Sequence, residues 1–181
     1  MSEQQWIQLL TEQRIGSEKS SDDDFRSPFQ RDIDRIIFSS AFRRLQDKTQ
    51  VFPLARNDYV RTRLTHSIEV SSVGRSLGLL VGRELKKRHK LPVDANAIAE
   101  IVGAACLAHD IGNPPFGHAG EDTIRHWFID PRRGERYLEQ LQEEESEEFK
   151  NFEGNAQGFR VLTRRQRHTR DNNTMGGLQL T

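Results

Sequence analysis

A break that contains Gly112, Pro114 and Pro115, called the Gly-Pro-Pro turn below, interrupts an apolar helical pattern at residues 106–122, CLAHDIGNPPFGHAGED. The helical pattern before the break starts at Asp94, which suits the N-cap position. Each proline lacks a backbone donor and pushes the preceding residue out of the helical region, so the helix must stop here. Helical periodicity resumes in HAGEDTIRHWF. The stretch therefore predicts two helices joined by a rigid turn, with His109 and Asp110 at the end of the first.

Apolar spacing predicts helices elsewhere too, and no parallel-sheet pattern is present. Helices are expected over residues 3–14, 32–48, 65–89, 135–150 and 152–166. Thr65 suits the N-cap of the third helix. Its expected buried stripe is Val70, Val73, Leu77, Leu80 and Val81, and that of the helix starting at Asp94 is Ile98, Ile101, Val102 and Ala105. The last helix, 152–166, carries apolar Phe159, Val161 and Leu162. The chain is predicted to be all-α.

Two segments lack helical periodicity. Residues 16–30 are rich in Ser, Asp and Gly and predict a loop, with order beginning near Asp32. We therefore divide the chain into an N-terminal helix with a flexible tether, residues 1–30, and one domain, residues 31–181. Residues 49–63, TQVFPLARNDYVRTR, alternate in polarity and contain a turn signal, which predicts an irregular extended or hairpin segment.

Composition excludes several classes of protein. The chain has 27 basic and 27 acidic residues, so its overall charge does not indicate a nucleic-acid partner. A single cysteine, Cys106, excludes an internal disulfide and fits a reducing compartment. No run approaches the roughly 20 apolar residues of a membrane span, and no leader pattern opens the chain. We expect a soluble, cytoplasmic protein.

Five arginines in residues 160–170 face either phosphate or the Glu-rich segment 139–150. We favour the Glu-rich segment as their partner.

Three groups of polar residues lie at predicted helix ends: His66, the pair His109 and Asp110, and the pair His118 and Glu121. Imidazole and carboxylate ligands suit a divalent metal, which would activate water and screen phosphate charge. His118 and Glu121 are three residues apart and share a helix face, as an acid/base unit requires. A single histidine on a helix is more often structural, but the grouping favours a hydrolytic site.

Three segments, RRLQDKTQVFPLARNDYVRTRLTHSIEV, LAHDIGNPPFGHAGE and FEGNAQGFR, resemble the HD-domain deoxynucleoside triphosphate triphosphohydrolases, specifically the deoxyguanosine triphosphate branch. The resemblance runs from about Asp32 to Thr181. It implies an all-α HD fold with a divalent metal, Mg²⁺ ahead of Mn²⁺, held by two histidines and two aspartates. Water would attack the α-phosphorus of dGTP or another dNTP and release deoxynucleoside and triphosphate. Homo-oligomers and regulation by single-stranded DNA are further implications.

The resemblance also implies a role for individual residues. The metal ligands would be His66, His109 and Asp110, and the acid/base pair His118 and Glu121. The substrate would contact Gln50 and Val51 at the sugar or base, Arg63 at the α-phosphate, and Asn155 near the phosphates. Without the resemblance, Arg63 could equally pair with Asp47 or Asp58, and Gln50 could be solvated.

The family's fourth ligand, an aspartate, is expected beyond Thr181, so the chain is expected to be the N-terminal portion of the HD phosphohydrolase domain, truncated at the C-terminus. This predicts weak metal affinity, exposed apolar helix faces and low or absent turnover. The competing hypothesis is a non-catalytic regulatory fragment that binds nucleotide or nucleic acid. A different HD phosphodiesterase is disfavoured by the GNPPFGHAGE block.

Overall fold

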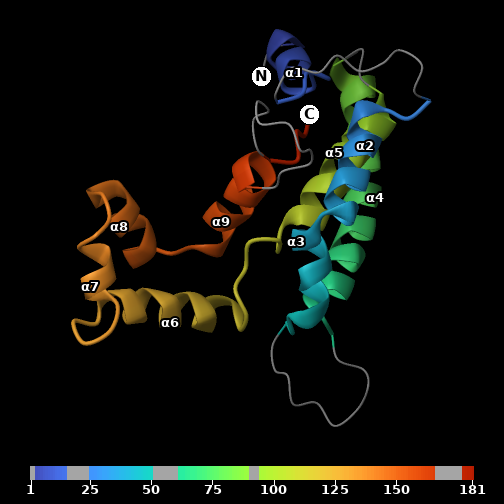
Figure 1. Ribbon diagram of the computed structural model, residues 1–181. Helices are drawn as coiled ribbons and strands as arrows, with labels where there is room; N and C mark the ends of the chain where they lie inside the picture. The colour runs from blue at the N-terminus through green and yellow to red at the C-terminus, as the bar shows by residue number, and fades with distance from the viewer. Residues whose placement is uncertain (1–2, 16–24, 51–60, 90–93, 166–176) are drawn as a thin grey trace.

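The computed structural model describes residues 3–15, 25–50, 61–89, 94–165 and 177–181 (Figure 1). Within these ranges every regular element is a helix, and the only pairing of extended chain is an isolated bridge between Thr49 and Thr62. The all-α prediction is confirmed. The α-helices are α1 Glu3–Leu9, α2 Pro28–Phe38, α3 Ser40–Arg43, α4 Arg63–His89, α5 Ala95–Ala108, α6 Gly117–Ile129, α7 Glu135–Leu138, α8 Glu143–Lys150 and α9 Gly154–Arg160. A 3₁₀-helix, η1, spans Arg44–Asp47, and a π-helix, η2, spans Val161–Arg165.

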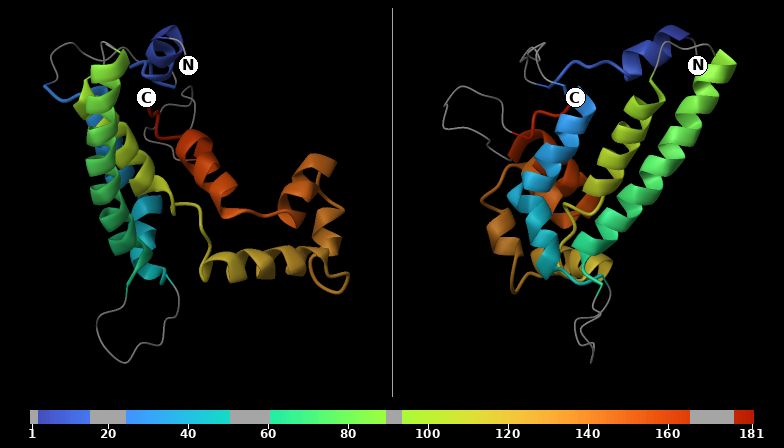
Figure 2. Two further views of the ribbon diagram at one scale, coloured as in Figure 1. Left: turned by 180° about the vertical axis from the view of Figure 1, so that it is seen from behind. Right: turned by 90° about the vertical axis from the view of Figure 1, so that its right-hand side faces the viewer.

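Helices α2, α4 and α5 lie side by side, and both figures show α6, α7 and α8 set apart from them (Figures 1 and 2). The chain leaves α5 through the Gly-Pro-Pro turn and reaches α6, then returns to the three helices through α9. Among the described helices, none is both long enough and apolar enough to cross a membrane.

Helices α4 and α5 pack closely because small residues line the contact. Gly74, Gly78 and Gly82 are buried on α4. A Cβ added to Gly78 would lie 3.0 Å from the Ala99 Cα and 3.1 Å from the Ile98 carbonyl oxygen. The backbones of the two helices are therefore almost in contact, and a larger side chain at Gly78 has no room.

The buried stripe predicted for α4 was wrong. Val73, Leu77, Leu80 and Val81 are more than half exposed, and Val70 is half-buried. The apolar residues were expected to face the core, but α5 packs on the small-residue face, where the helix axes can come closer. On α5 the prediction holds for Ile98, whereas Ile101 and Val102 are half-buried and Ala105 is exposed.

Several helix boundaries also differ from those predicted, because polar side chains provide caps that apolar periodicity does not reveal. Ser27 accepts a hydrogen bond from Gln30 N at 2.9 Å, so residues 28–30, expected as loop, form the first turn of α2. Ser39 breaks the helix expected over 32–48 by capping α3. Thr62, not Thr65, caps α4 and accepts from Thr65 N at 3.3 Å. The acidic helix is two helices, and Gln142 starts the second with a capping box.

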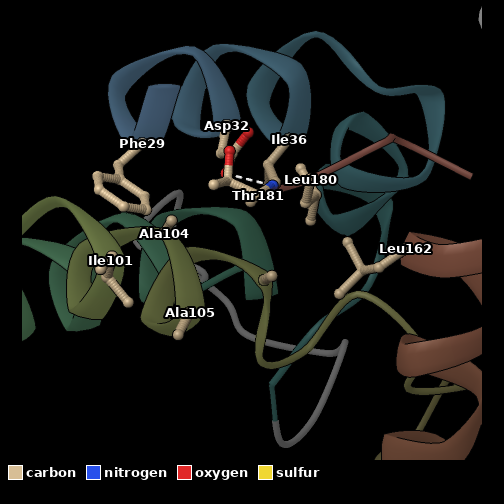
Figure 3. Close-up of a pocket in the computed structure, with 10 residues that line it drawn as sticks. Phe29, Asp32, Ile36, Ile101, Ala104, Ala105, Leu162, Leu180 and Thr181 are labelled. Carbon is tan, nitrogen blue, oxygen red and sulfur yellow. Dashed lines mark hydrogen bonds between the residues drawn. The ribbon is translucent and has the colours of Figure 1, made fainter. Parts of the chain in front are cut away.

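The core lies between α2, α3, η1 and α5, and contacts with Asp32 hold the segments around Arg14 and Thr181 beside it. Its buried residues include Ile36, Phe42, Leu45, Leu107, Ile111 and Leu178. Buried Arg14 pairs with Asp32 at 2.8 Å, and Thr181 N donates to the second oxygen of Asp32 at 2.8 Å (Figure 3). Beside this contact lies a mainly apolar pocket of about 200 Å³, lined by residues of α2, α5 and the last described segment.

Gly78→Val tests the close contact between α4 and α5. We expect it to lower the free energy of unfolding by about 2 kcal/mol, because overpacking a helix contact forces backbone shifts. Leu77→Val, an exposed neighbour, should change it by no more than about 0.5 kcal/mol. Urea unfolding measures both. Equal stabilities for the two variants would contradict the packing described.

Candidate functional site

Three side chains converge where the first turn of α4 meets the end of α5. His66, His109 and Asp110 each offer one ligand atom, and these atoms all lie within 4.8 Å of one another. The imidazole rings of His66 and His109 meet edge to face, with centroids 5.3 Å apart. The Gly-Pro-Pro turn allows this arrangement. It ends α5 at Ala108, so His109 and Asp110 directly follow the helix. The structure thus brings together the three residues predicted as metal ligands.

The hydrogen bonding of His109 fixes which ring nitrogen can bind a metal. Its Nδ1 lies 2.7 Å from the Cys106 carbonyl oxygen, which can only accept, so Nδ1 carries the proton. In the neutral ring, Nε2 then presents a lone pair 3.5 Å from Asp110 Oδ1. Two lone pairs that face each other at this distance fit a cation between them.

Asp110 is buried and held by neighbours at both oxygens. Its Oδ1 accepts a hydrogen bond from Asn113 Nδ2 at 2.6 Å. Its Oδ2 lies 2.9 Å from Arg63 Nη1 but has no aligned hydrogen bond among the described residues. Both side chains of this ion pair are 7% exposed. Oδ1 is therefore the oxygen that faces His109, whereas Oδ2 faces Arg63.

Arg63 therefore has a different partner from those considered on sequence alone. Its ion partner in the described residues is Asp110; Asp58 lies outside those residues, and Asp47 is on η1. The other end of the guanidinium faces α6, because a Cβ added to Gly117 would lie 2.6 Å from Arg63 Nη2. Arg63 Nε is buried without a hydrogen-bond partner in the described chain.

Lys48 and Asn113 also belong to the site, although sequence reasoning missed both. Lys48 Nζ donates to the Asn113 carbonyl oxygen at 2.7 Å. Burial lowers the pKa of Lys48, the nearby guanidinium groups of Arg63 and Arg44 lower it further, and Asp110 partly offsets them. Asn113 follows Asp110 by three residues inside the turn, which is a signal the sequence offered. Lys48 carried no signal beyond its place in a basic segment.

The predicted acid/base pair forms at the start of α6. His118 Nδ1 lies 3.1 Å from Glu121 Oε2; the imidazole is 96% exposed, whereas the carboxylate is buried. Glu121 Oε1 accepts from Gly154 N at 2.9 Å, and Arg125 Nη2 lies 3.3 Å from Oε2. Burial raises the pKa of Glu121. The hydrogen bonds from His118 and Gly154 and the charge of Arg125 together lower it by more, so the pKa lies below its ordinary value.

Besides Arg63, the structure describes two of the predicted substrate contacts, Gln50 and Asn155, and they lie on different parts of the chain. Gln50 is half-buried next to the bridge residue Thr49, and its N–H donates to the Arg61 carbonyl oxygen at 3.2 Å. Val51 lies outside the described residues. Asn155 is exposed, and its amide donates at 2.7 Å to Glu153, the N-cap residue of α9. The described geometry therefore engages Asn155 in helix capping.

The basic segment at residues 160–170 is described only in part. Arg160 pairs with Glu148 on α8, as the favoured interpretation predicted for this segment. The hydrogen bond from Arg160 to Glu148 raises the pKa of the guanidinium. Arg167 and Arg170 lie outside the described residues.

Comparison with known proteins gives consistent relatives. Residues 63–173 match the HD domain family. The chain is 52% identical over 177 residues to a deoxyguanosinetriphosphate triphosphohydrolase-like protein of Pseudomonas aeruginosa, an alignment that covers 97% of this chain and 39% of the relative. Proteins of the same name from Synechocystis and Listeria innocua are 52% and 46% identical and are covered over 40% and 37% of their lengths.

These matches confirm the resemblance found in the sequence. The chain spans about two fifths of the length of these relatives. The alignments with these relatives cover 88–98% of the chain. The HD match includes all of the predicted metal ligands, His66, His109 and Asp110, and the pair His118 and Glu121. The chain belongs to the HD domain family.

Proposed function

We propose that this chain carries the His/Asp part of a metal-dependent phosphohydrolase site that acts on dGTP, and on other dNTPs as further substrates. The observation that carries the proposal is the convergence of His66, His109 and Asp110 within 4.8 Å. The names of the relatives, which describe deoxyguanosinetriphosphate triphosphohydrolase-like proteins, support the choice of substrate.

The donor set fits one divalent cation, held by a nitrogen of His66, Nε2 of His109 and a carboxylate oxygen of Asp110. A bound cation would lower the pKa of a coordinated water and neutralise phosphate charge. The family resemblance makes Mg²⁺ the expected ion. Mn²⁺ is the alternative, because two imidazoles suit a transition metal better than Mg²⁺. Arg63 supports the site by holding Asp110, and its guanidinium would balance the charge of a phosphate bound beside the metal.

We assign proton transfer to His118. Its Nδ1 is held by the ionised Glu121, which fixes the ring and leaves Nε2 facing solvent, where substrate can approach. In the proposed reaction, water adds to the α-phosphorus and the bond to the 5′-oxygen breaks, which releases deoxynucleoside and triphosphate. His118 would supply or remove the proton at this centre. Gln50, Val51 and Asn155 remain proposed contacts to the sugar, base and phosphates.

The proposed metal site is tested by His109→Ala. This residue is partly exposed, so its loss should not disturb the core, but it removes one of three ligands. We expect Mn²⁺ affinity to fall by at least about tenfold, measured by electron paramagnetic resonance of the free ion. His126→Ala, an exposed histidine on α6, is the matched control. Equal Mn²⁺ affinities for wild type and His109→Ala would reject the site.

The role of His118 is tested by His118→Ala in an assay of triphosphate release from dGTP with Mg²⁺ or Mn²⁺. Loss of a general acid/base should lower turnover by roughly 10²–10⁴-fold and leave Mn²⁺ affinity unchanged. The assay compares this chain with a longer form that covers the relatives' full length. If the variant retains wild-type turnover in the form that is active, the assignment is wrong. Unchanged nucleotide binding without any turnover in either form would favour the non-catalytic hypothesis.

The buried carboxylate of Glu121 makes a pH-dependent contribution to stability. Because its folded pKa lies below its unfolded value, the contribution is complete above the unfolded pKa and is lost as pH falls through the folded pKa. Glu121→Gln should therefore lower the free energy of unfolding by about 1.5 kcal/mol at pH 7 and by less near pH 3. Glu139→Gln, on the surface, serves as the control in urea titrations at both pH values. A difference that stays constant with pH would contradict the pKa direction.

A further inference from the structure

Lys48 contacts both chain segments that carry the candidate metal ligands. Its carbonyl oxygen accepts a hydrogen bond at 2.8 Å from the N–H of Arg63, the first residue of α4, three residues before His66. Its ammonium group donates at 2.7 Å to the carbonyl oxygen of Asn113, in the turn that follows His109 and Asp110. One residue therefore bridges the start of α4 and the Gly-Pro-Pro turn.

Asn113 extends this contact to the candidate ligand itself. Its side-chain Nδ2 donates to Asp110 Oδ1 at 2.6 Å, and its backbone N–H donates to the Asp110 carbonyl oxygen at 3.1 Å. The Lys48 ammonium thus holds the backbone of Asn113, and the side chain of Asn113 in turn orients Asp110. In metal sites, groups that hydrogen-bond the ligands in this way fix ligand geometry and affect affinity.

Without a hydrogen-bond partner, a charged lysine would be unfavourable at position 48. The side chain is half-buried, and two other cations, Arg63 and Arg44, act on it. A lysine stem is long enough to turn its head to solvent. The ammonium instead lies on the Asn113 carbonyl, where it gains a charge-assisted hydrogen bond.

We propose that Lys48 is a positioning residue for the candidate metal site. It links the start of α4, which carries His66, to the turn that carries His109 and Asp110, and it orients Asp110 through Asn113. Lys48 does not touch the ion or the reacting atoms. The inference rests on the metal site proposed above.

Lys48→Met tests this role, because methionine keeps most of the apolar stem and removes the donor. Lys48→Arg restores a cationic donor, and Lys86→Met makes the same chemical change at an exposed position of α4. The first measurement is hydrogen exchange of the amides of residues 109–113 in the metal-free chain. The second is Mn²⁺ affinity, by electron paramagnetic resonance of the free ion.

We expect Lys48→Met to speed exchange in residues 109–113 roughly fivefold, the effect of one lost hydrogen bond, and to weaken Mn²⁺ binding about tenfold. Lys48→Arg should recover most of both losses, and Lys86→Met should match wild type. Faster exchange with unchanged Mn²⁺ affinity would reduce Lys48 to a structural contact and overturn the proposal. Unchanged exchange and Mn²⁺ affinity with weaker dGTP binding would overturn it too and make Lys48 a phosphate contact. If the wild-type chain takes up no Mn²⁺, the proposed metal site fails and this inference fails with it, whereas a defect confined to Lys48→Met leaves the site intact.

Discussion

The close packing of α4 against α5 sets the distance between the two parts of the candidate metal site. His66 comes from the start of α4, whereas His109 and Asp110 come directly after α5. Ligand atoms from separate helices lie within 4.8 Å of one another only if the helix axes approach closely. Buried glycines on α4 allow this approach, because a Cβ at Gly78 would already meet the backbone of α5. Residues far from any chemistry thus determine whether the ligands can meet.

Charge compensation around Asp110 is the second constraint. A buried carboxylate is costly unless neighbouring groups stabilise its charge. Arg63 supplies a guanidinium at 2.9 Å, and Asn113 supplies a hydrogen bond at 2.6 Å. Lys48 reaches the same turn through the Asn113 carbonyl. The cationic groups would also favour the anionic substrate proposed for this site, a nucleoside triphosphate.

Local pattern predicted the types of element and the contacts between near neighbours in the chain better than it predicted packing. Proline chemistry located the end of α5, and helical spacing paired His118 with Glu121, because both depend on near neighbours in the chain. The buried face of α4 was assigned to Leu77 and Leu80 on hydrophobicity, but close backbone contact favoured the glycine face. Asp110 as the partner of Arg63, and Lys48 as a neighbour of Asn113, depend on tertiary contacts between distant residues. No periodicity in the sequence encodes such contacts.

The ion pair between Arg63 and Asp110 also bears on folding without metal. Small domains whose sites form only with metal unfold when the metal is removed, because the free energy of metal binding is part of their folding free energy. Here the guanidinium balances the carboxylate within the chain, with both groups 7% exposed. An incoming cation must therefore compete with Arg63 for Asp110 rather than fill an electrostatic deficit. We therefore expect this region to fold without the proposed metal, and we expect metal binding to be weakened by the free energy needed to loosen that internal counter-ion.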